Sequence, residues 1–283
     1  MPDLGSVLIT GASTGIGKAS AFLLERKGYR VFAGVRRDID AKTLRQESSG
    51  RLTPVILDVT DRASIEQARD LIVEATDSLA GLVNNAGIVV AGPLEALSLE
   101  EVRHQFEVNV FGALAVTQAF IPHLRPGPGR IVNVSSINGR IVTPFAAPYG
   151  ASKFALEALS DGLRLELRPW GISVSVIQPG AIETAIWLTS TERALNNAKR
   201  FSPEMLELYP GVISAIERRG GQPPKRAIPP ERVAEAIHRA LTARRPRTRY
   251  IVGNDARIAA VFSALLPDRL KDYILTRRRG NKR

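Results

Sequence analysis

The sequence contains no cysteine, which excludes disulfide bonds and zinc sites built on thiolates. Its histidines, His104, His123 and His238, are scattered and show no metal-ligand spacing. No apolar run reaches the roughly 18 residues that a membrane-spanning helix needs. The first strand-like run begins at Val7, which leaves no room for a cleaved signal peptide. We therefore expect no metal site and a cytoplasmic protein.

Positive charge is concentrated near the C-terminus. The net charge is +11, and residues 218–283 contain 18 Lys and Arg against 5 Asp and Glu. No base-reading module accompanies this charge, so we expect no nucleic-acid partner. Residues 256–283 form a basic extension that could contact an anionic membrane surface peripherally. The favoured alternative is packing on the domain or on a second subunit of a homo-oligomer. The apolar stripe of this extension consists of Ile258, Val261, Phe262, Leu265, Leu266, Leu270, Ile274 and Leu275.

Apolar strand-like runs alternate with helical patterns along most of the chain. This alternation predicts an α/β fold, a doubly wound parallel sheet with helices on both faces. No linker or repeat interrupts it, so residues 1–283 are expected to form a single domain. The expected strands are Val7–Thr10, Val31–Val35, Thr53–Leu57, Gly81–Asn84, Arg130–Ser135, Ile172–Ile177 and Arg249–Val252.

The alternation breaks over residues 185–228, which are rich in proline and glycine. A stretch this long favours a substrate lid over a plain connection. Its apolar residues suggest a bulky hydrophobic alcohol or ketone as substrate, although packing on the domain explains them equally well. They are Ile186, Trp187, Leu188, Phe201, Met205, Leu206, Leu208 and Tyr209.

A glycine turn follows the first expected strand. Gly11, Gly15 and Gly17 stand between that strand and a helical pattern. Such a turn presents backbone N–H groups and the positive end of the helix dipole to a pyrophosphate. The alternative is an ordinary tight turn.

The second expected strand ends in Val35-Arg36-Arg37 instead of an acidic residue. A carboxylate there would accept hydrogen bonds from ribose hydroxyls, whereas arginine can clamp a 2′-phosphate. We therefore expect NADP(H), with NAD(H) the less favoured cofactor. The alternative is a solvated pair of arginines.

Tyr149 and Lys153 are four residues apart, so a helix places them on one face. An ammonium beside a phenol favours the phenolate and lowers the phenol pKa, and such a phenol can exchange a proton with a substrate oxygen. Ser136 follows an expected strand, where its hydroxyl could polarise the same oxygen. Asn109 lies within an expected helix that Ser98 opens, and a structural amide explains it as well as a proton relay does.

These motifs together resemble the short-chain dehydrogenase/reductase family, in its NADP-preferring, hydroxysteroid- and retinol-like branch. The resemblance covers about residues 4–184 and resumes weakly near 249–253. Its motifs are Thr10-Gly-x-x-x-Gly-Ile-Gly17, Asp58-Val59, Asn84-Asn-Ala-Gly87, Asn109, Ser136, Tyr149-x-x-x-Lys153 and Pro179-Gly180.

The resemblance implies a Rossmann-type fold and alcohol–carbonyl redox chemistry with a nicotinamide cofactor. It implies that Asp58 holds the adenine amino group, that Asn84 and its neighbours support the sheet beside the ribose, and that Asn109 holds a relay water behind Lys153. The Pro179-Gly180 turn would face the nicotinamide. The cofactor set is Gly11, Ser13, Thr14, Gly15, Ile16, Gly17, Arg36, Arg37, Asp58, Val59, Asn85, Ala86, Gly87, Tyr149, Lys153, Pro179, Gly180, Ile182 and Thr184.

One departure concerns Thr14, which stands where many NADP-preferring members have a basic residue; Ser13 could donate to the 2′-phosphate instead. The alternative function is a non-catalytic NADP(H)-binding sensor or scaffold. Such proteins lose acid–base residues, whereas Ser136, Tyr149 and Lys153 are all present here. We therefore expect an enzyme that transfers a hydride between NADP(H) and a hydrophobic carbonyl or alcohol such as a steroid, retinoid or lipid.

Overall fold

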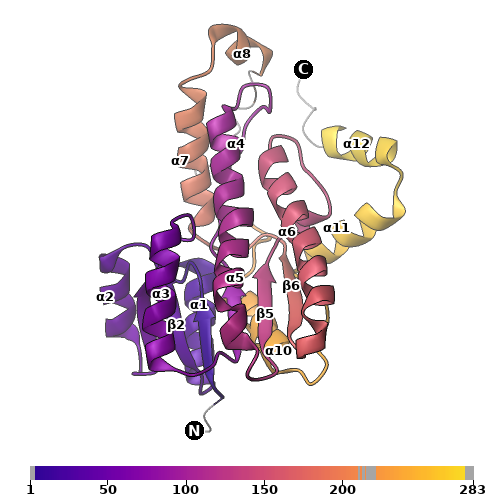
Figure 1. Cartoon of the computed structure of the whole chain (residues 1–283). Coiled ribbons are helices and arrows are strands. Elements are labelled where there is room, and N and C mark those ends of the chain that lie inside the picture. Colours follow the sequence, from indigo (N-terminus) through magenta and orange to yellow (C-terminus); the bar gives the residue numbers. More distant parts are fainter. Residues whose placement is uncertain (1–3, 210, 212–213, 215–220, 278–283) are drawn as a thin grey trace.

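Seven parallel strands form one sheet between two layers of helices in the computed structural model (Figure 1). The structure describes residues 4–209, 211, 214 and 221–277. The strand order is β3-β2-β1-β4-β5-β6-β7. The strands are β1 (Ser6–Ile9), β2 (Arg30–Val35), β3 (Leu52–Ile56), β4 (Gly81–Asn84), β5 (Arg130–Val134), β6 (Ser173–Pro179) and β7 (Arg249–Val252).

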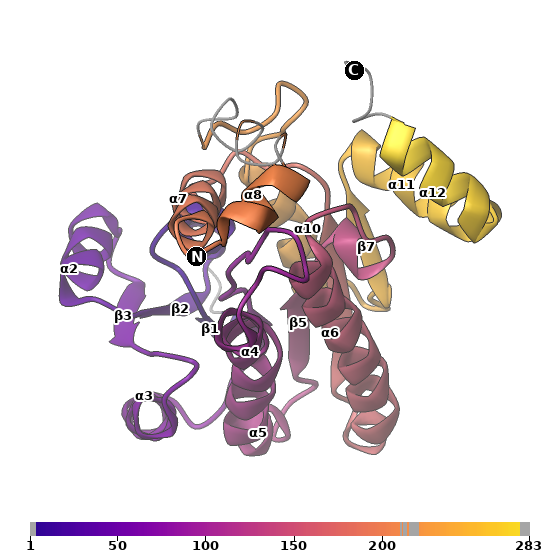
Figure 2. The ribbon, with the colours of Figure 1, turned by 90° about the horizontal axis from the view of Figure 1, so that it is seen from above.

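Helices cover both faces of the sheet, with α3, α5 and α6 on one face and α1 and α10 on the other (Figure 2). Each face has its own apolar core, which explains why the strands are apolar along their whole length. The helices of the sheet layers are α1 (Gly15–Arg26), α2 (Asp38–Glu47), α3 (Arg62–Ala75), α4 (Leu99–Phe106), α5 (Ala113–Leu124), α6 (Ala147–Glu166) and α10 (Glu231–Thr242).

The expected α/β fold is confirmed, and all seven expected strands are present with ends shifted by no more than two residues. The strand order reverses at β1: β2 and β3 lie on one side of it and β4 to β7 on the other. The reversal falls between β1 and β4, which are parallel, hydrogen-bonded neighbours. Ligands of open parallel sheets bind at the carboxyl ends of the strands beside such a reversal. The glycine turn after β1 lies at this position.

The segment that carries Asn109 differs from the simple helix expected. Ser98 does cap α4, since its hydroxyl accepts a hydrogen bond from the N–H of Glu101. However, α4 ends at Phe106 and the chain continues as a π-helix, Glu107–Gly112, before α5 begins. π-helical turns widen a helix locally and are frequent at functional sites.

The segment 185–228, the expected substrate lid, is largely helical in its described part. It contains α7 (Ile186–Ala198) and α8 (Pro203–Leu208), which rise above the sheet (Figure 1). Both ends of the segment return to one place, because Ile182 and Ile228 form a parallel bridge. The indole N–H of Trp187 also donates to the Ile182 carbonyl at 2.7 Å.

The C-terminal helices, α11 (Asn254–Leu265) and α12 (Asp268–Arg277), extend from the β7 edge (Figure 2). Part of their apolar stripe does not pack on the domain: Ile258 is 70 % exposed and Leu265 is 74 % exposed. The final residues 278–283 lie outside the described residues. Within the described part of the chain, every helix is too short or too polar to cross a bilayer.

Candidate active site

The glycine turn has a backbone that side chains would not tolerate. Gly11 and Gly15 have φ values of +65° and +54°, a region that favours glycine. A Cβ on Gly17 would lie 2.2 Å from the carbonyl oxygen of Gly11. A Cβ on Gly11 would lie 2.8 Å from the Cα of Ala86, so this turn packs tightly on the end of β4.

The N-terminus of α1 offers its first N–H groups to a ligand. Thr14 is the N-cap residue, but its side chain makes no capping hydrogen bond, and the first turn of α1 has no acidic residue. A cavity of about 520 Å³ adjoins Thr14, Gly15 and Thr184. Ser13 is partly buried beside this turn, and Ile16 packs on the apolar core. A helix N-terminus of this kind fits a pyrophosphate.

Asn85 and Ala86 fix the shape of the turn. The Asn85 side-chain amide donates to the carbonyl oxygens of Thr10 and Gly11, both at 3.0 Å. The Thr10 hydroxyl accepts from the backbone N–H groups of Asn85 and Ala86, again at 3.0 Å. In the buried centre of the sheet, the Asn84 Nδ2 donates a hydrogen bond to the Asn133 Oδ1 at 2.8 Å.

Arg36 and Arg37 are in different situations at the end of β2. The Arg37 guanidinium forms two hydrogen bonds to Asp40, at 2.8 and 2.7 Å. Arg36 is exposed and forms no ion pair within the described residues. Burial alone would raise the pKa of Asp58, but hydrogen bonds from Thr60 and the charge of Arg36 outweigh it and lower that pKa. The charge of Arg36 thus acts on Asp58, whereas the Arg37 guanidinium is paired with Asp40. Val59 packs against Gly112 of the π-helix.

Ser136 and Tyr149 meet just beyond the end of β5. The Ser136 hydroxyl accepts from the N–H of Asn138 at 3.1 Å, and it lies close enough to the Tyr149 phenol to act on the pKa of that group. Burial raises the pKa of Tyr149, although the Ser136 hydroxyl opposes this. Tyr149 is therefore protonated at neutral pH in this structure, contrary to the expected lowering of its pKa.

Lys153 lies beneath Tyr149 and is almost wholly buried, with 5 % exposure. Its Nζ is 5.7 Å from the centre of the Tyr149 ring and donates to the Val134 carbonyl at 2.9 Å. Burial lowers the pKa of Lys153 to about 8, against the opposing charge of Glu157. The expected helix face does bring the two side chains together, but burial of the phenol itself is the largest influence on the Tyr149 pKa.

Asn109 projects from the π-helix toward the same region. Its Oδ1 accepts from the N–H of Ile88 at 2.9 Å, and its Nδ2 donates to the Ile88 carbonyl and to the Ser152 hydroxyl, both at 3.1 Å. A Cβ on Gly87 would lie 3.3 Å from the Asn109 Oδ1 and 3.8 Å from the Lys153 Nζ. Gly87 therefore leaves room between these two side chains.

The Pro179-Gly180 turn reaches the glycine loop from the other side. A Cβ on Gly15 would lie 2.8 Å from the Thr184 Cγ2, so Thr184 lies against that loop. Ile182 is 5 % exposed, and its side chain belongs to the core and not to the open crevice. A Cβ on Gly180 would lie 2.2 Å from an Asp255 carboxylate oxygen, and Asp255 accepts from the N–H of Ala181 at 2.8 Å.

Three residues near the site were absent from the sequence-based set. Asp255 orders the turn after β6, and Ser152 holds Asn109. Phe145 has a φ of +67°, which is strained for an aromatic residue, and its ring meets Tyr209 edge-on at 6.0 Å. Asp255 follows Gly253 at the end of a strand, a placement that could have drawn attention. No local pattern marks Phe145.

The family model for short chain dehydrogenases matches residues 6–194. The chain belongs to this family. It is 39% identical to an uncharacterized oxidoreductase, YbbO, of Escherichia coli, over 95% of this chain and 93% of the relative. It is 38% identical to 17-beta-hydroxysteroid dehydrogenase type 6 of Bos taurus, over 96% of this chain and 87% of the relative. The family member described here is thus an oxidoreductase, as expected.

Solved structures of short-chain dehydrogenases are similar along the whole chain. One from Burkholderia cenocepacia, in complex with NADP, is 28% identical with a TM-score of 0.71, and 95% of each chain is covered. A 3-ketoacyl-(acyl-carrier-protein) reductase from Brucella melitensis with NADH is 24% identical with a TM-score of 0.71, covering 88% of this chain and 97% of that one. At that identity the second likeness shows the fold alone.

Proposed function

We propose that this short-chain dehydrogenase uses NADP(H) to interconvert a bulky apolar alcohol and its carbonyl compound. The observation that carries the proposal is the meeting of Ser136, Tyr149 and Lys153 beside the glycine turn. A hydroxyl donor, a partly buried phenol and a buried ammonium at one point are suited to proton exchange with a substrate oxygen.

The glycine turn and the ends of β2 and β3 fit a dinucleotide. Gly11, Gly15 and Gly17 permit close approach to the N–H groups of α1, where a pyrophosphate would bind. Asp58 would hold the adenine end. Arg36, rather than Arg37, would meet a 2′-phosphate, because Arg37 is already engaged by Asp40. The NADP complex of the Burkholderia relative supports this choice of cofactor.

A bound nicotinamide cofactor supplies or accepts the hydride. In reduction, Tyr149 donates its proton to the substrate oxygen while the Ser136 hydroxyl donates a hydrogen bond to that oxygen. Lys153, still largely protonated at neutral pH with its pKa of about 8, stabilises the negative charge left on Tyr149. Asn109 keeps Ile88 and Ser152 in place around Lys153 and would hold a relay water.

The segment of α7 and α8 would roof the substrate. Arg193 of α7 bonds to Glu101 at 3.2 Å, and the Tyr209 hydroxyl bonds to Glu95, so the roof is tied to the loop and helix that follow β4. Phe201 lies against Gly92, and Phe145 lies against Tyr209. These rings would form an aromatic wall of the substrate site beneath α7 and α8. The wall and the likeness to a hydroxysteroid dehydrogenase support a steroid, retinoid or lipid-like substrate.

A panel of hydrophobic ketones and alcohols, assayed by NADPH absorbance, tests the proposal with wild type and Tyr149→Phe. We expect turnover of at least one bulky compound and a fall of about a hundredfold or more in Tyr149→Phe, with NADPH affinity little changed. Near-normal turnover in Tyr149→Phe would remove the proton donor from the mechanism. NADPH binding without turnover of any compound would favour a sensor or scaffold.

A further inference from the structure

The helices α11 and α12 expose an apolar stripe at the edge of the molecule. Ile258, Val261 and Leu265 follow one face of α11 and are 70 %, 58 % and 74 % exposed. On α12, Leu270 and Tyr273 are 42 % and 52 % exposed. The opposite face of α11 carries Ala256 and Ala260, which are buried against the domain. This helix is therefore anchored on one face and apolar on the other.

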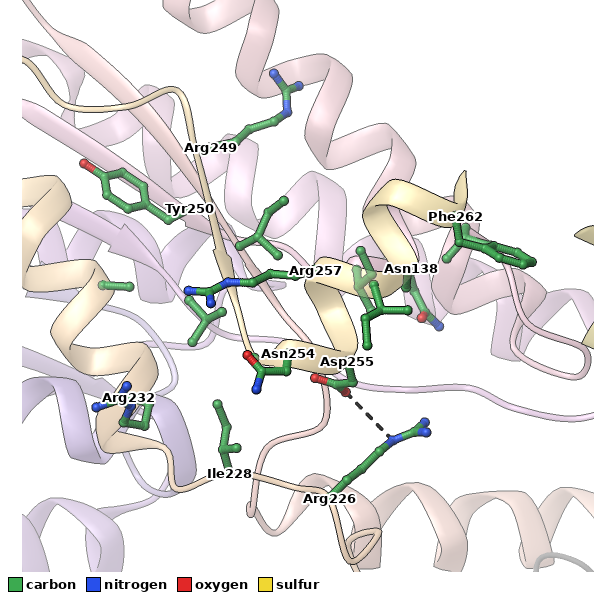
Figure 3. A pocket seen from close by; sticks show the side chains of 18 of the residues that line it. Asn138, Arg226, Ile228, Arg232, Arg249, Tyr250, Asn254, Asp255, Arg257 and Phe262 are labelled. Carbon is green, nitrogen blue, oxygen red and sulfur yellow. Dashed lines mark ion pairs between the residues drawn. The ribbon is translucent and has the colours of Figure 1, made fainter. Parts of the chain in front are cut away.

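A basic cavity of about 1060 Å³ adjoins this stripe between β7, α10 and the two C-terminal helices. Asp255 is the sole carboxylate among the described residues that line it, and it lies 4.0 Å from Arg226. Figure 3 shows Arg257 extending from α11 across β7 toward the helix that carries Arg232. The arginines that line the cavity are Arg226, Arg232, Arg239, Arg247, Arg249 and Arg257.

Only part of this positive charge is neutralised within the protein. Arg249 is held by Glu157 and Asp161, at 2.9 and 2.7 Å. Arg257, by contrast, forms no ion pair within the described part of the chain. Ile258, the next residue, both lines the cavity and begins the exposed stripe. The basic and apolar surfaces are therefore continuous.

We propose that α11, α12 and the arginines beside them dock on the surface of an anionic lipid bilayer. An apolar helix face flanked by basic residues buries its side chains at the acyl boundary while its cations meet anionic head groups. A second copy is a poorer occupant, because a twofold interface here would bring the same arginines toward each other. The proposal does not rest on the proposed substrate.

Vesicle sedimentation tests the docking surface. The full chain should sediment with vesicles in which a third of the phosphatidylcholine is replaced by phosphatidylglycerol, but not with phosphatidylcholine alone, and added salt should release it. Leu265→Glu should weaken binding by about tenfold or more, because it removes an apolar side chain that the bilayer would bury and adds a negative charge that the anionic lipid repels. Arg257→Glu should weaken it by at least about fivefold.

Matched controls carry the same substitutions elsewhere. Leu165→Glu changes a 62 % exposed leucine on α6, and Arg45→Glu changes an exposed arginine on α2; both should bind like wild type. The proposal would be overturned if the full chain did not bind the anionic vesicles at low salt. It would also be overturned if binding survived Leu265→Glu but vanished when residues 278–283 were removed. A dimer detected by light scattering that Leu265→Glu dissociates would overturn it as well.

Discussion

Lys153 holds a positive charge where burial makes that charge unfavourable. Below pH 8 the folded and unfolded chains both keep its proton, and the folded state bears the full cost of the buried ammonium. Above pH 8 the folded-state lysine loses its proton, while in the unfolded chain, with a pKa of about 10.4, it is retained. The folded state then binds fewer protons, so this residue makes wild-type stability rise with pH.

Lys153→Met should therefore stabilise the protein without its cofactor. The loss of the hydrogen bond to Val134 offsets part of the gain, which leaves an increase of about 1–2 kcal/mol in the free energy of unfolding at pH 7. Urea unfolding at pH 7 and near pH 10 measures it, and the gain should shrink at the higher pH. Lys42→Met on the exposed face of α2 is the control. An equal change at both pH values would show that burial of this charge is not the cause.

The two arginines after β2 should contribute unequally to cofactor preference. Arg36→Ala should reduce the preference for NADPH over NADH by about ten- to a hundredfold, since a charge-assisted phosphate contact is worth about 1.5–3 kcal/mol. Arg37→Ala should change the preference by less than about threefold, because Asp40 already holds its guanidinium. Titration of both cofactors against wild type and each variant decides this. A wild type that prefers NADH would make the NADP(H) assignment wrong.

The spacing of residues in the sequence predicted which side chains meet in the site better than it predicted how buried those side chains are. The separation of Tyr149 and Lys153 fixed a shared helix face, and the structure has it. The spacing did not report burial, which reverses the expected direction of the Tyr149 pKa. The spacing also could not show that Val35, at the strand end where an acidic residue would accept from ribose hydroxyls, is 1 % exposed. A Val35→Asp substitution would therefore place a carboxylate in a buried position.

At the scale of elements, the π-helix makes Asn109 a structural residue whatever its part in catalysis. Asn109→Ala would leave the backbone N–H of Ile88 without its buried partner, and we expect the free energy of unfolding to fall by about 2–3 kcal/mol. Thermal unfolding and turnover should be measured on the same preparation. A relay role requires turnover to fall as well, at a temperature where the variant remains folded. Unchanged stability would mean that the loop after β4 does not depend on this amide.

Strands were easier to predict than the helices of the roof. The strands β1 to β6 contribute to the apolar cores on both faces of the sheet, so their apolar runs are visible in the sequence without knowledge of their neighbours. The helices α7 and α8 lie in a stretch rich in proline and glycine, where the alternation of strands and helices breaks. Pro203 begins α8, where the first turn tolerates proline, and Ser202 caps that helix.

At the scale of the whole molecule, parallel topology gathers distant segments at one edge. The glycine turn follows β1, Ser136 follows β5, the Gly180 turn follows β6 and α11 follows β7. Asp255 joins the last two, because its carboxylate accepts from the N–H of Ala181. The C-terminal helices are thus linked to the site by the first turn of α11, while Ile258, Val261 and Leu265 on the outer face of α11 are exposed.

Two truncations should separate these parts. A chain that ends after Leu266 loses α12, whose Leu270 and Tyr273 are largely exposed, and its free energy of unfolding should stay within about 1 kcal/mol of wild type. A chain that ends after Gly253 also loses Ala256, Ala260 and the hydrogen bond that Asp255 accepts from Ala181, and should be less stable by about 3 kcal/mol or more. Urea unfolding followed by circular dichroism measures both. Equal losses in the two truncations would mean that α12 packs on the domain and that its apolar face is not available to a lipid surface.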